Sequence, residues 1–185
     1  MADHLTRFLG GTTGQWRVLR TRVVTGAGLA PVVRLAIVDP GNALPVEAAD
    51  WVLRGVASYE RYVTRPERQL LTARQERLGR PHATCAALIP IAKSATWWDL
   101  TQDERRAVLE TRSGHIRTGA RYLPAVARQL YHCRDLGEPF DFLTWFEYAP
   151  RDEGAFDELV GLLRDSEEWQ FVEREIDMRL ERSDG

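Results

Sequence analysis

The sequence predicts an α+β fold, because segments with the two-residue periodicity of strands alternate with segments of helical periodicity. In the second half of the chain the predicted order is strand, helix, strand, strand, helix, strand, which suits a ferredoxin-like unit. The strands expected in the first half suit a shorter version of the same unit. We therefore expect a truncated N-terminal ferredoxin-like subdomain at residues 1–82 and a complete C-terminal ferredoxin-like subdomain at residues 83–185.

The first half is expected to be mainly strands. Runs rich in β-branched residues predict strands at Gln15–Val24 and Pro31–Val38, with turn residues between and after them. The segment Glu47–Leu53 predicts a short helix, and Val52–Val63 is expected to contain another strand. Thr64–Pro81 is dense in Arg and Glu and weakly periodic, so we expect a long loop with some helix.

The second half has clearer signals. Ala83–Ile91 is an apolar run that predicts a buried strand. Thr101 and Glu104 have the spacing of a capping box and predict the start of a helix that meets a break at Gly114. The remaining expected elements are two strands, an amphipathic helix and a last strand, at Ala125–Cys133, Phe140–Tyr148, Asp152–Arg164 and Phe171–Leu180.

Composition excludes several classes of function. The formal net charge is −2 and no block of Lys or Arg is present, so we expect no nucleic-acid partner. The two cysteines, Cys85 and Cys133, lack the spacing of a zinc site and suggest free thiols in a reducing compartment. We also expect no signal peptide, because the start MADHLTRFLGG carries an acid and has no apolar core, and no membrane span, because no apolar stretch reaches 18 residues.

His115 is the first candidate functional residue. The four histidines are His4, His82, His115 and His132, and each taken alone is more readily structural or exposed than a ligand. His115 differs because it lies just past the expected helix break, where a side chain can be directed into a cavity. A neutral imidazole there could bind iron from one side of a haem.

Strand parity gives a second set of candidates, because side chains two residues apart point to the same face. Arg128, Leu130 and His132 share one face of their strand, and Phe142, Thr144, Phe146 and Tyr148 share a face of the next. An apolar face with a single arginine has two interpretations. It is a core face whose arginine pairs with a carboxylate at the rim, or an apolar pocket with one cation for an anionic substrate.

Lys93, Trp97 and Trp98 form a third group. Adjacent tryptophans can cover a large flat apolar ligand, and an indole N–H can donate to a polar group on it. Lys93 could meet a carboxylate such as a haem propionate. A Trp-Trp pair is equally common in protein cores, so this pattern alone is weak.

The segment from Leu88 to Leu180 resembles the chlorite dismutase family. The resemblance is most specific at Lys93 with Trp97-Trp98, at His115, and in the runs Arg128–His132 and Phe142–Glu147. The 13-residue spacing from His115 to Arg128 is similar to that between the proximal histidine and the distal arginine of the family. The ending EEWQFVEREIDMRLER resembles the short, dimeric branch, which has no signal peptide.

Carried over residue by residue, the resemblance implies a haem b protein of the dimeric α+β-barrel superfamily. His115 would be the proximal ligand of the haem iron, and Glu168, with Glu167 as the neighbouring alternative, would accept a hydrogen bond from its other nitrogen. Arg128 would be the catalytic distal arginine. Positions implied to contact the cofactor or line its pocket are Lys93, Trp97, Trp98, Leu130, Thr144 and Phe146.

The function implied by the resemblance is conversion of chlorite to chloride and molecular oxygen by a cytoplasmic homodimer. In the implied mechanism, the O–O bond forms between a ferryl oxygen and a hypochlorite fragment held by Arg128. Three alternatives are a coproheme decarboxylase, a dye-decolourising-type peroxidase and a non-catalytic α+β-barrel protein. The first typically has no distal arginine, and the GxxDG motif of the second is absent from this sequence.

Overall fold

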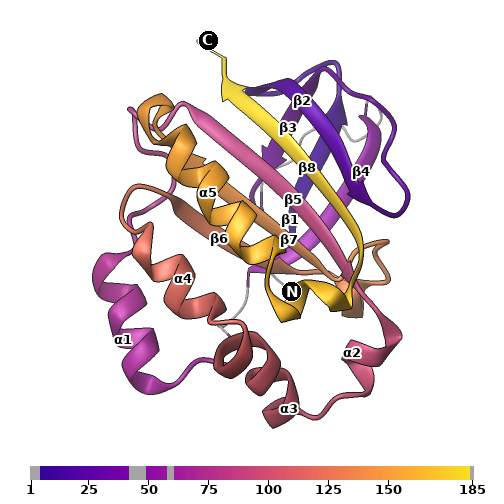
Figure 1. Cartoon of the computed structure of the whole chain (residues 1–185). Helices are drawn as coiled ribbons and strands as arrows, with labels where there is room; N and C mark the ends of the chain where they lie inside the picture. Colours follow the sequence, from indigo (N-terminus) through magenta and orange to yellow (C-terminus); the bar gives the residue numbers. More distant parts are fainter. Residues whose placement is uncertain (1–4, 42–48, 58–60, 184–185) are drawn as a thin grey trace.

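A computed structural model describes residues 5–41, 49–57 and 61–183 of the chain. Within these residues, strands close into an antiparallel barrel in the order β1-β3-β2-β8-β5-β7-β6-β4. The strands are β1 (Leu5–Gly11), β2 (Trp16–Thr25), β3 (Arg34–Val38), β4 (Ala49–Ala57), β5 (Cys85–Lys93), β6 (Ala127–His132), β7 (Phe142–Tyr148) and β8 (Val172–Arg182). The α-helices lie on the side of the barrel away from β2 and β3 (Figure 1).

The helices belong mainly to the second half of the chain. The α-helices are α1 (Arg65–Arg74), α2 (Ala95–Asp99), α3 (Gln102–Arg106), α4 (His115–Arg121) and α5 (Glu153–Arg164). A π-helical segment, η2 (Ala107–Arg112), connects α3 to the turn before α4. Short 3₁₀ helices are η3 (Arg134–Leu136), η4 (Pro150–Asp152) and η5 (Glu167–Phe171).

Each half of the chain contributes one contiguous half of the barrel. Strands β4, β1, β3 and β2 are neighbours, and so are β8, β5, β7 and β6. If the strands of each half are numbered 1 to 4 in chain order, both halves have the same spatial order, 4-1-3-2. Only four residues, 12–15, connect β1 to β2, so no helix fits between them.

Strand β5 is apolar from Cys85 to Ala92, up to its last residue Lys93, and both of its faces are buried. Ala86 and Leu88 point into the barrel, where they pack in a core that includes Trp145 and Ile176. Residues of the opposite face belong to a second core beneath α5; they are Ala87, Ile89 and Ile91. This second core packs α5 against the barrel and forms part of the wall of the site described below.

The N-terminal half departs from the expected elements. The helix expected at Glu47–Leu53 is wrong from Ala49 onward, because these residues begin β4; Glu47 and Ala48 lie outside the described residues. Strand β1 was not expected, yet it pairs along β4, with Phe8 opposite Leu53. Pairing with β1 here overrides the local helical preference of Ala49–Leu53.

Two expected strands of this half are confirmed, as β2 and a shortened β3. The strand expected within Val52–Val63 is present as the later part of β4, which ends at Ala57. The segment Thr64–Pro81 does contain helix: α1 begins with a capping box between Thr64 and Glu67.

In the second half, the expected strands and the amphipathic helix are confirmed with small shifts at their ends. The capping box of Thr101 and Glu104 is also confirmed and starts α3. The expected single helix up to Gly114 instead changes to π-helical geometry at Ala107. A further helix, α4, then starts at His115 itself.

Candidate active site

A cavity of about 590 Å³ lies between the helices and the second-half strands of the barrel. Side chains from the helices α1, α2, η2, α4, α5 and η5 and from the strands β5, β6, β7 and β8 line it, together with residues next to α1. Most of the lining is apolar. Two sets of polar residues are considered in turn: Lys93, Glu168 and His115, which contact one another, and Arg128 with Gln75.

The backbone around His115 is held by its own chain. Gly114 precedes it in the left-handed conformation, with φ of 62°, which glycine adopts without strain. Glu110, in the π-helix, accepts hydrogen bonds from the backbone N–H groups of Ile116 at 2.6 Å and Arg117 at 3.3 Å. Because these N–H groups belong to the first turn of α4, Glu110 fixes the start of the helix and the position of His115.

A buried chain of charged and polar groups continues from His115. Its Nδ1 lies 2.6 Å from Oε2 of Glu168, and Nζ of Lys93 donates to Oε1 of the same carboxylate at 2.8 Å. The side chains of Lys93 and Glu168 are 4% and 5% exposed. Since Nδ1 is engaged by the carboxylate, Nε2 of His115 is the nitrogen that can bind a metal ion in the cavity.

Glu168 is held as a carboxylate. Burial would raise its pKa, but the charges of His115 and Lys93 and their hydrogen bonds outweigh burial and lower the pKa to about 2. Its backbone N–H donates to Oγ of Ser113 at 2.9 Å. The neighbouring Glu167 points elsewhere and pairs with Arg112 at the surface, so the carboxylate that contacts His115 is that of Glu168.

The facing strands β6 and β7 form the opposite part of the lining. Their register places Arg128 beside Phe146, Leu130 beside Thr144, and His132 beside Phe142, and all six residues line the cavity. This agrees with the faces expected from strand parity. These six residues bring one guanidinium group to a wall that is otherwise mostly apolar.

Arg128 lies close to two helices, α1 through its backbone carbonyl and α4 through its guanidinium. Its carbonyl oxygen accepts a hydrogen bond from Nε2 of Gln75, the residue that caps α1, at 2.9 Å. Its guanidinium reaches α4, where a Cβ atom added to Gly119 would lie 3.4 Å from Nη1. Gly119 is one helical turn beyond His115, so the small residue leaves room for the guanidinium on the helix that presents the imidazole.

The two adjacent tryptophans have different surroundings. Trp97 is buried at the cavity, its ring centroid lies 4.6 Å from Nζ of Lys93, and its Nε1 has no hydrogen-bond partner within the described part of the chain. Trp98 instead lines a smaller pocket of about 210 Å³. Its Nε1 donates to Asp141 at 3.2 Å, and the guanidinium of Arg134 lies 4.0 Å from its ring centroid.

Lys93 also differs from its expected surroundings. The carboxylate that it meets is a protein side chain, Glu168, and its ammonium is enclosed by the rings of Trp97 and Trp169. The sequence predicted a haem propionate as the carboxylate partner of Lys93, whereas the structure places Glu168 there.

His132 is neutral at pH 7 in these surroundings. Burial and the nearby charge of Arg61 lower its pKa to about 4, against a smaller opposing effect of Asp135. Its Nε2 is buried and has no hydrogen-bond partner among the residues that the structure describes. At neutral pH the imidazole of His132 therefore adds no positive charge to the side of the cavity where Arg128 lies.

Sequence reasoning missed several polar residues of the lining, among them Gln75, Trp169 and Glu175. Gln75 lies in a segment expected to be mostly loop. The alternation of apolar and charged residues along β8 did mark Glu175, but that pattern is usually solvent-facing, whereas Glu175 is fully buried. Trp169 directly follows Glu168, and nothing in its local sequence indicates the direction of its ring.

The donor set suits a prosthetic group better than a bare ion. No group of three or more His, Cys, Asp or Glu side chains capable of holding a metal ion occurs in residues 5–41, 49–57 and 61–183. A single imidazole facing an apolar cavity is instead the type of axial ligand that haem iron uses. Separately, none of the helices in the described ranges has the length and apolar character needed to cross a membrane.

The chain is similar to known proteins in both sequence and structure. The family model described as chlorite dismutase matches residues 46–182. Chlorite dismutase of Ideonella dechloratans is 40% identical over 75 residues, which cover 40% of this chain and only 24% of that protein. The dimeric chlorite dismutase of Nitrobacter winogradskyi has 56% identity and a TM-score of 0.90, covering 96% of this chain and 99% of that one.

A more distant structure shares the fold alone. A variant chlorite dismutase of Candidatus Nitrospira defluvii has a TM-score of 0.70 at 19% identity and covers 99% of this chain. The match to the family model spans most of the chain, including every cavity residue discussed above. On this evidence the chain belongs to the chlorite dismutase family.

Proposed function

We propose that this protein is a haem b-dependent chlorite dismutase, which converts chlorite to chloride and molecular oxygen. The observation that carries the proposal is that His115, backed by a buried carboxylate, and Arg128 line the same largely apolar cavity. The dimeric relative from Nitrobacter winogradskyi supports the assignment, because it has 56% identity over nearly the whole of both chains.

The lining fits a haem group in three respects. Nε2 of His115 is the imidazole nitrogen left for iron, as argued above. The apolar residues of β5 and β7, among them Ile89, Ile91 and Phe146, suit a flat hydrophobic macrocycle. The buried indole N–H of Trp97 has no protein acceptor within the described residues, and a haem carboxylate would supply one.

Each residue has a separate task in this proposal. Haem iron, when bound, supplies the redox chemistry of oxygen transfer. Glu168 accepts a hydrogen bond from the Nδ1–H group of His115, which fixes the imidazole tautomer and makes Nε2 a stronger ligand. Lys93 compensates the charge of Glu168, so this carboxylate stays ionised although it is buried.

Arg128 has the task of holding anions. A guanidinium is permanently charged and presents several N–H donors, so it attracts chlorite into the cavity and orients it. The apolar side chains of Leu130 and Phe146 exclude water and offer no base. Contacts between a guanidinium and an oxyanion contribute about 1.5–3 kcal/mol each, and more in a drier site.

The same proposal includes three properties of the whole protein: its domain organisation, its oligomeric state and its location in the cell. The matching strand order of the two barrel halves supports two ferredoxin-like units, truncated at 1–82 and complete at 83–185. The dimeric relative supports a homodimer. The thiols of Cys85 and Cys133 are both unpaired, which supports the reducing environment of the cytoplasm.

The first test addresses His115. We expect purified protein reconstituted with haem to show a Soret band and to release oxygen when chlorite is added. His115→Ala should lose haem or bind it far more weakly, while His82→Ala, which replaces an exposed histidine, should bind normally. Full haem occupancy with an unchanged Soret band in His115→Ala would refute the ligand assignment, and haem binding without oxygen release would refute the reaction.

The second test addresses Arg128. Chlorite that gives up one oxygen atom leaves hypochlorite, and we expect Arg128→Ala to bind haem but to release hypochlorite and inactivate after fewer turnovers. Arg121→Ala removes an exposed arginine from α4 and serves as the control. Turnover is counted with an oxygen electrode, with and without a hypochlorite-trapping reagent. Equal total turnover and no trapped hypochlorite in Arg128→Ala would contradict the anion-holding role.

A further inference from the structure

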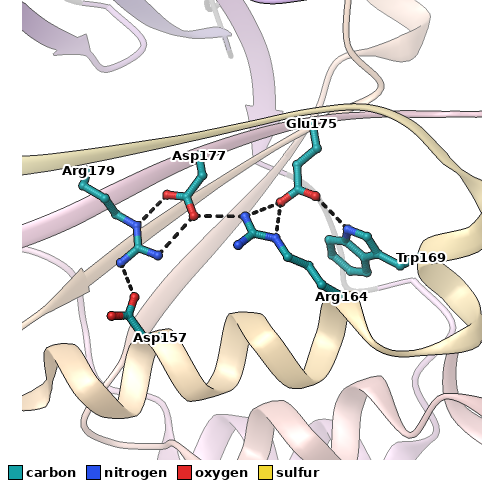
Figure 2. Close-up of polar contacts among 6 residues, drawn as sticks. All are labelled: Asp157, Arg164, Trp169, Glu175, Asp177 and Arg179. Carbon is teal, nitrogen blue, oxygen red and sulfur yellow. Dashed lines mark hydrogen bonds and ion pairs between the residues drawn. The ribbon is translucent and has the colours of Figure 1, made fainter. Parts of the chain in front are cut away.

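The charged face of β8 lies beneath α5 instead of facing solvent (Figure 2). Glu175, Asp177 and Arg179 alternate along the strand, so they share one face, and they are 0%, 2% and 6% exposed. Arg164 of α5 donates to Glu175 at 2.5 Å and to Asp177 at 2.9 Å. Arg179 donates to Asp177 at 2.5 Å and to Asp157 at 2.7 Å, which completes the network.

Trp169 joins this network to the cavity. Its indole N–H donates to Oε2 of Glu175 at 2.7 Å, as Figure 2 shows. The centroid of the same ring lies 5.5 Å from Nζ of Lys93, and the ring of Trp97 lies 4.6 Å from that Nζ. The ammonium of Lys93 is therefore surrounded by two indole rings and by the carboxylate of Glu168.

We propose that Trp169 is a positioning residue that acts through Lys93 on the hydrogen bond between Glu168 and His115. The inference rests on the proposed role of His115 as an iron ligand. Glu168 is shared, because one oxygen accepts from Lys93 and the other lies against Nδ1 of His115. A firmly held ammonium draws charge density from the carboxylate and weakens its pull on the imidazole proton.

Glu175 strengthens the effect of Trp169 in two ways. The hydrogen bond fixes the orientation of the indole, and donation to a carboxylate makes the ring more electron-rich and a better partner for a cation. Arg164 in turn holds Glu175 from the helix side with two hydrogen bonds. The charge network under α5 thus determines how tightly Lys93 is kept on Glu168.

The test uses the haem-loaded protein and a spectroscopic signal that does not depend on turnover. The iron–histidine stretching band of the ferrous form reports how strongly the imidazole binds iron. In Trp169→Phe, which loses the indole N–H, we expect this band at higher wavenumber and the iron reduction potential at a more negative value. Both shifts follow from a carboxylate that turns from Lys93 toward His115.

A matched control is available in the barrel interior. Trp145 is also buried and its Nε1 donates to a buried glutamate, Glu147, at 3.0 Å, but it packs against Trp16 and not against the cavity. We expect Trp145→Phe to leave the band unchanged. A second comparison introduces Trp169→Phe into Lys93→Met, where the residue through which Trp169 acts is absent, and we expect no further shift there.

The possible results separate this inference from the proposed function. Absence of an iron–histidine band in the wild-type protein overturns the assignment of His115 and this inference together. A normal wild-type band that does not move in fully loaded Trp169→Phe, or that moves equally in Trp145→Phe, overturns only the inference. An equal shift in the Lys93→Met background does the same. If Trp169→Phe does not fold, Glu175→Gln weakens the same indole contact and gives the same comparison.

Discussion

The carboxylate of Glu168 should be one of the most sensitive positions for stability even before any cofactor binds. Glu168→Gln removes the charge that compensates Lys93, whose side chain is only 4% exposed. Removing one partner of a buried ion pair costs about 3–5 kcal/mol, because the other charge remains buried without compensation. Since domains of this size unfold with only about 5–15 kcal/mol, the loss should be a large share of the total.

The adjacent Glu167 provides the control for this prediction. It pairs with Arg112 with the two side chains 40% and 48% exposed, and such surface pairs contribute about 0–1 kcal/mol. Urea unfolding of the haem-free protein at pH 7, followed by tryptophan fluorescence, measures both variants against the wild type. The reasoning is refuted if Glu168→Gln loses no more free energy of unfolding than Glu167→Gln.

Two further predictions concern the core and pH. Phe156 is fully buried, with ring centroids of Tyr148 and Phe146 at 4.5 and 5.0 Å, so Phe156→Ala should lower the free energy of unfolding by about 3–5 kcal/mol; a loss below ~1 kcal/mol in urea unfolding would contradict this packing. Burial and Arg61 lower the pKa of His132 from 6.5 to about 4, so the unfolded chain binds this proton more tightly and stability should increase as pH rises through that range. His132→Gln should flatten that part of the curve of unfolding free energy against pH, and an unchanged slope would argue against the shift.

The faces of the strands were predictable from the sequence, because alternation along a strand is set by covalent geometry. Arg128 and Leu130 were expected on one face, and Thr144 and Phe146 on another, and the structure places all four on one cavity. The continuous apolar run of β5 likewise indicated a strand buried on both sides. Local periodicity was sufficient in these cases since each conclusion concerns residues close together in the chain.

Features that depend on distant partners were not predictable in the same way. Ala49–Leu53 was expected to be helical, but it pairs with residues of β1 that lie 38 to 45 positions earlier, and β1 has only a short apolar sequence. The π-helix of η2 brings Glu110 to the first turn of α4, and no local motif indicates that geometry. The partner of Lys93 was also beyond local reasoning, since Glu168 is 75 residues away.

The charge network between β8 and α5 has a consequence for how this sequence can change. Sliding α5 along the strand by one helical turn would separate Arg164 from Glu175 and Asp177; Asp177 would keep Arg179, but Glu175 would lose its counter-ion in a buried layer. An all-aliphatic layer would tolerate such a slip far better, because its contacts are not directional. We therefore expect the pairing of acids and arginines to keep this helix in a single register against the strand. Substitutions in that layer should be accepted mainly in compensating pairs.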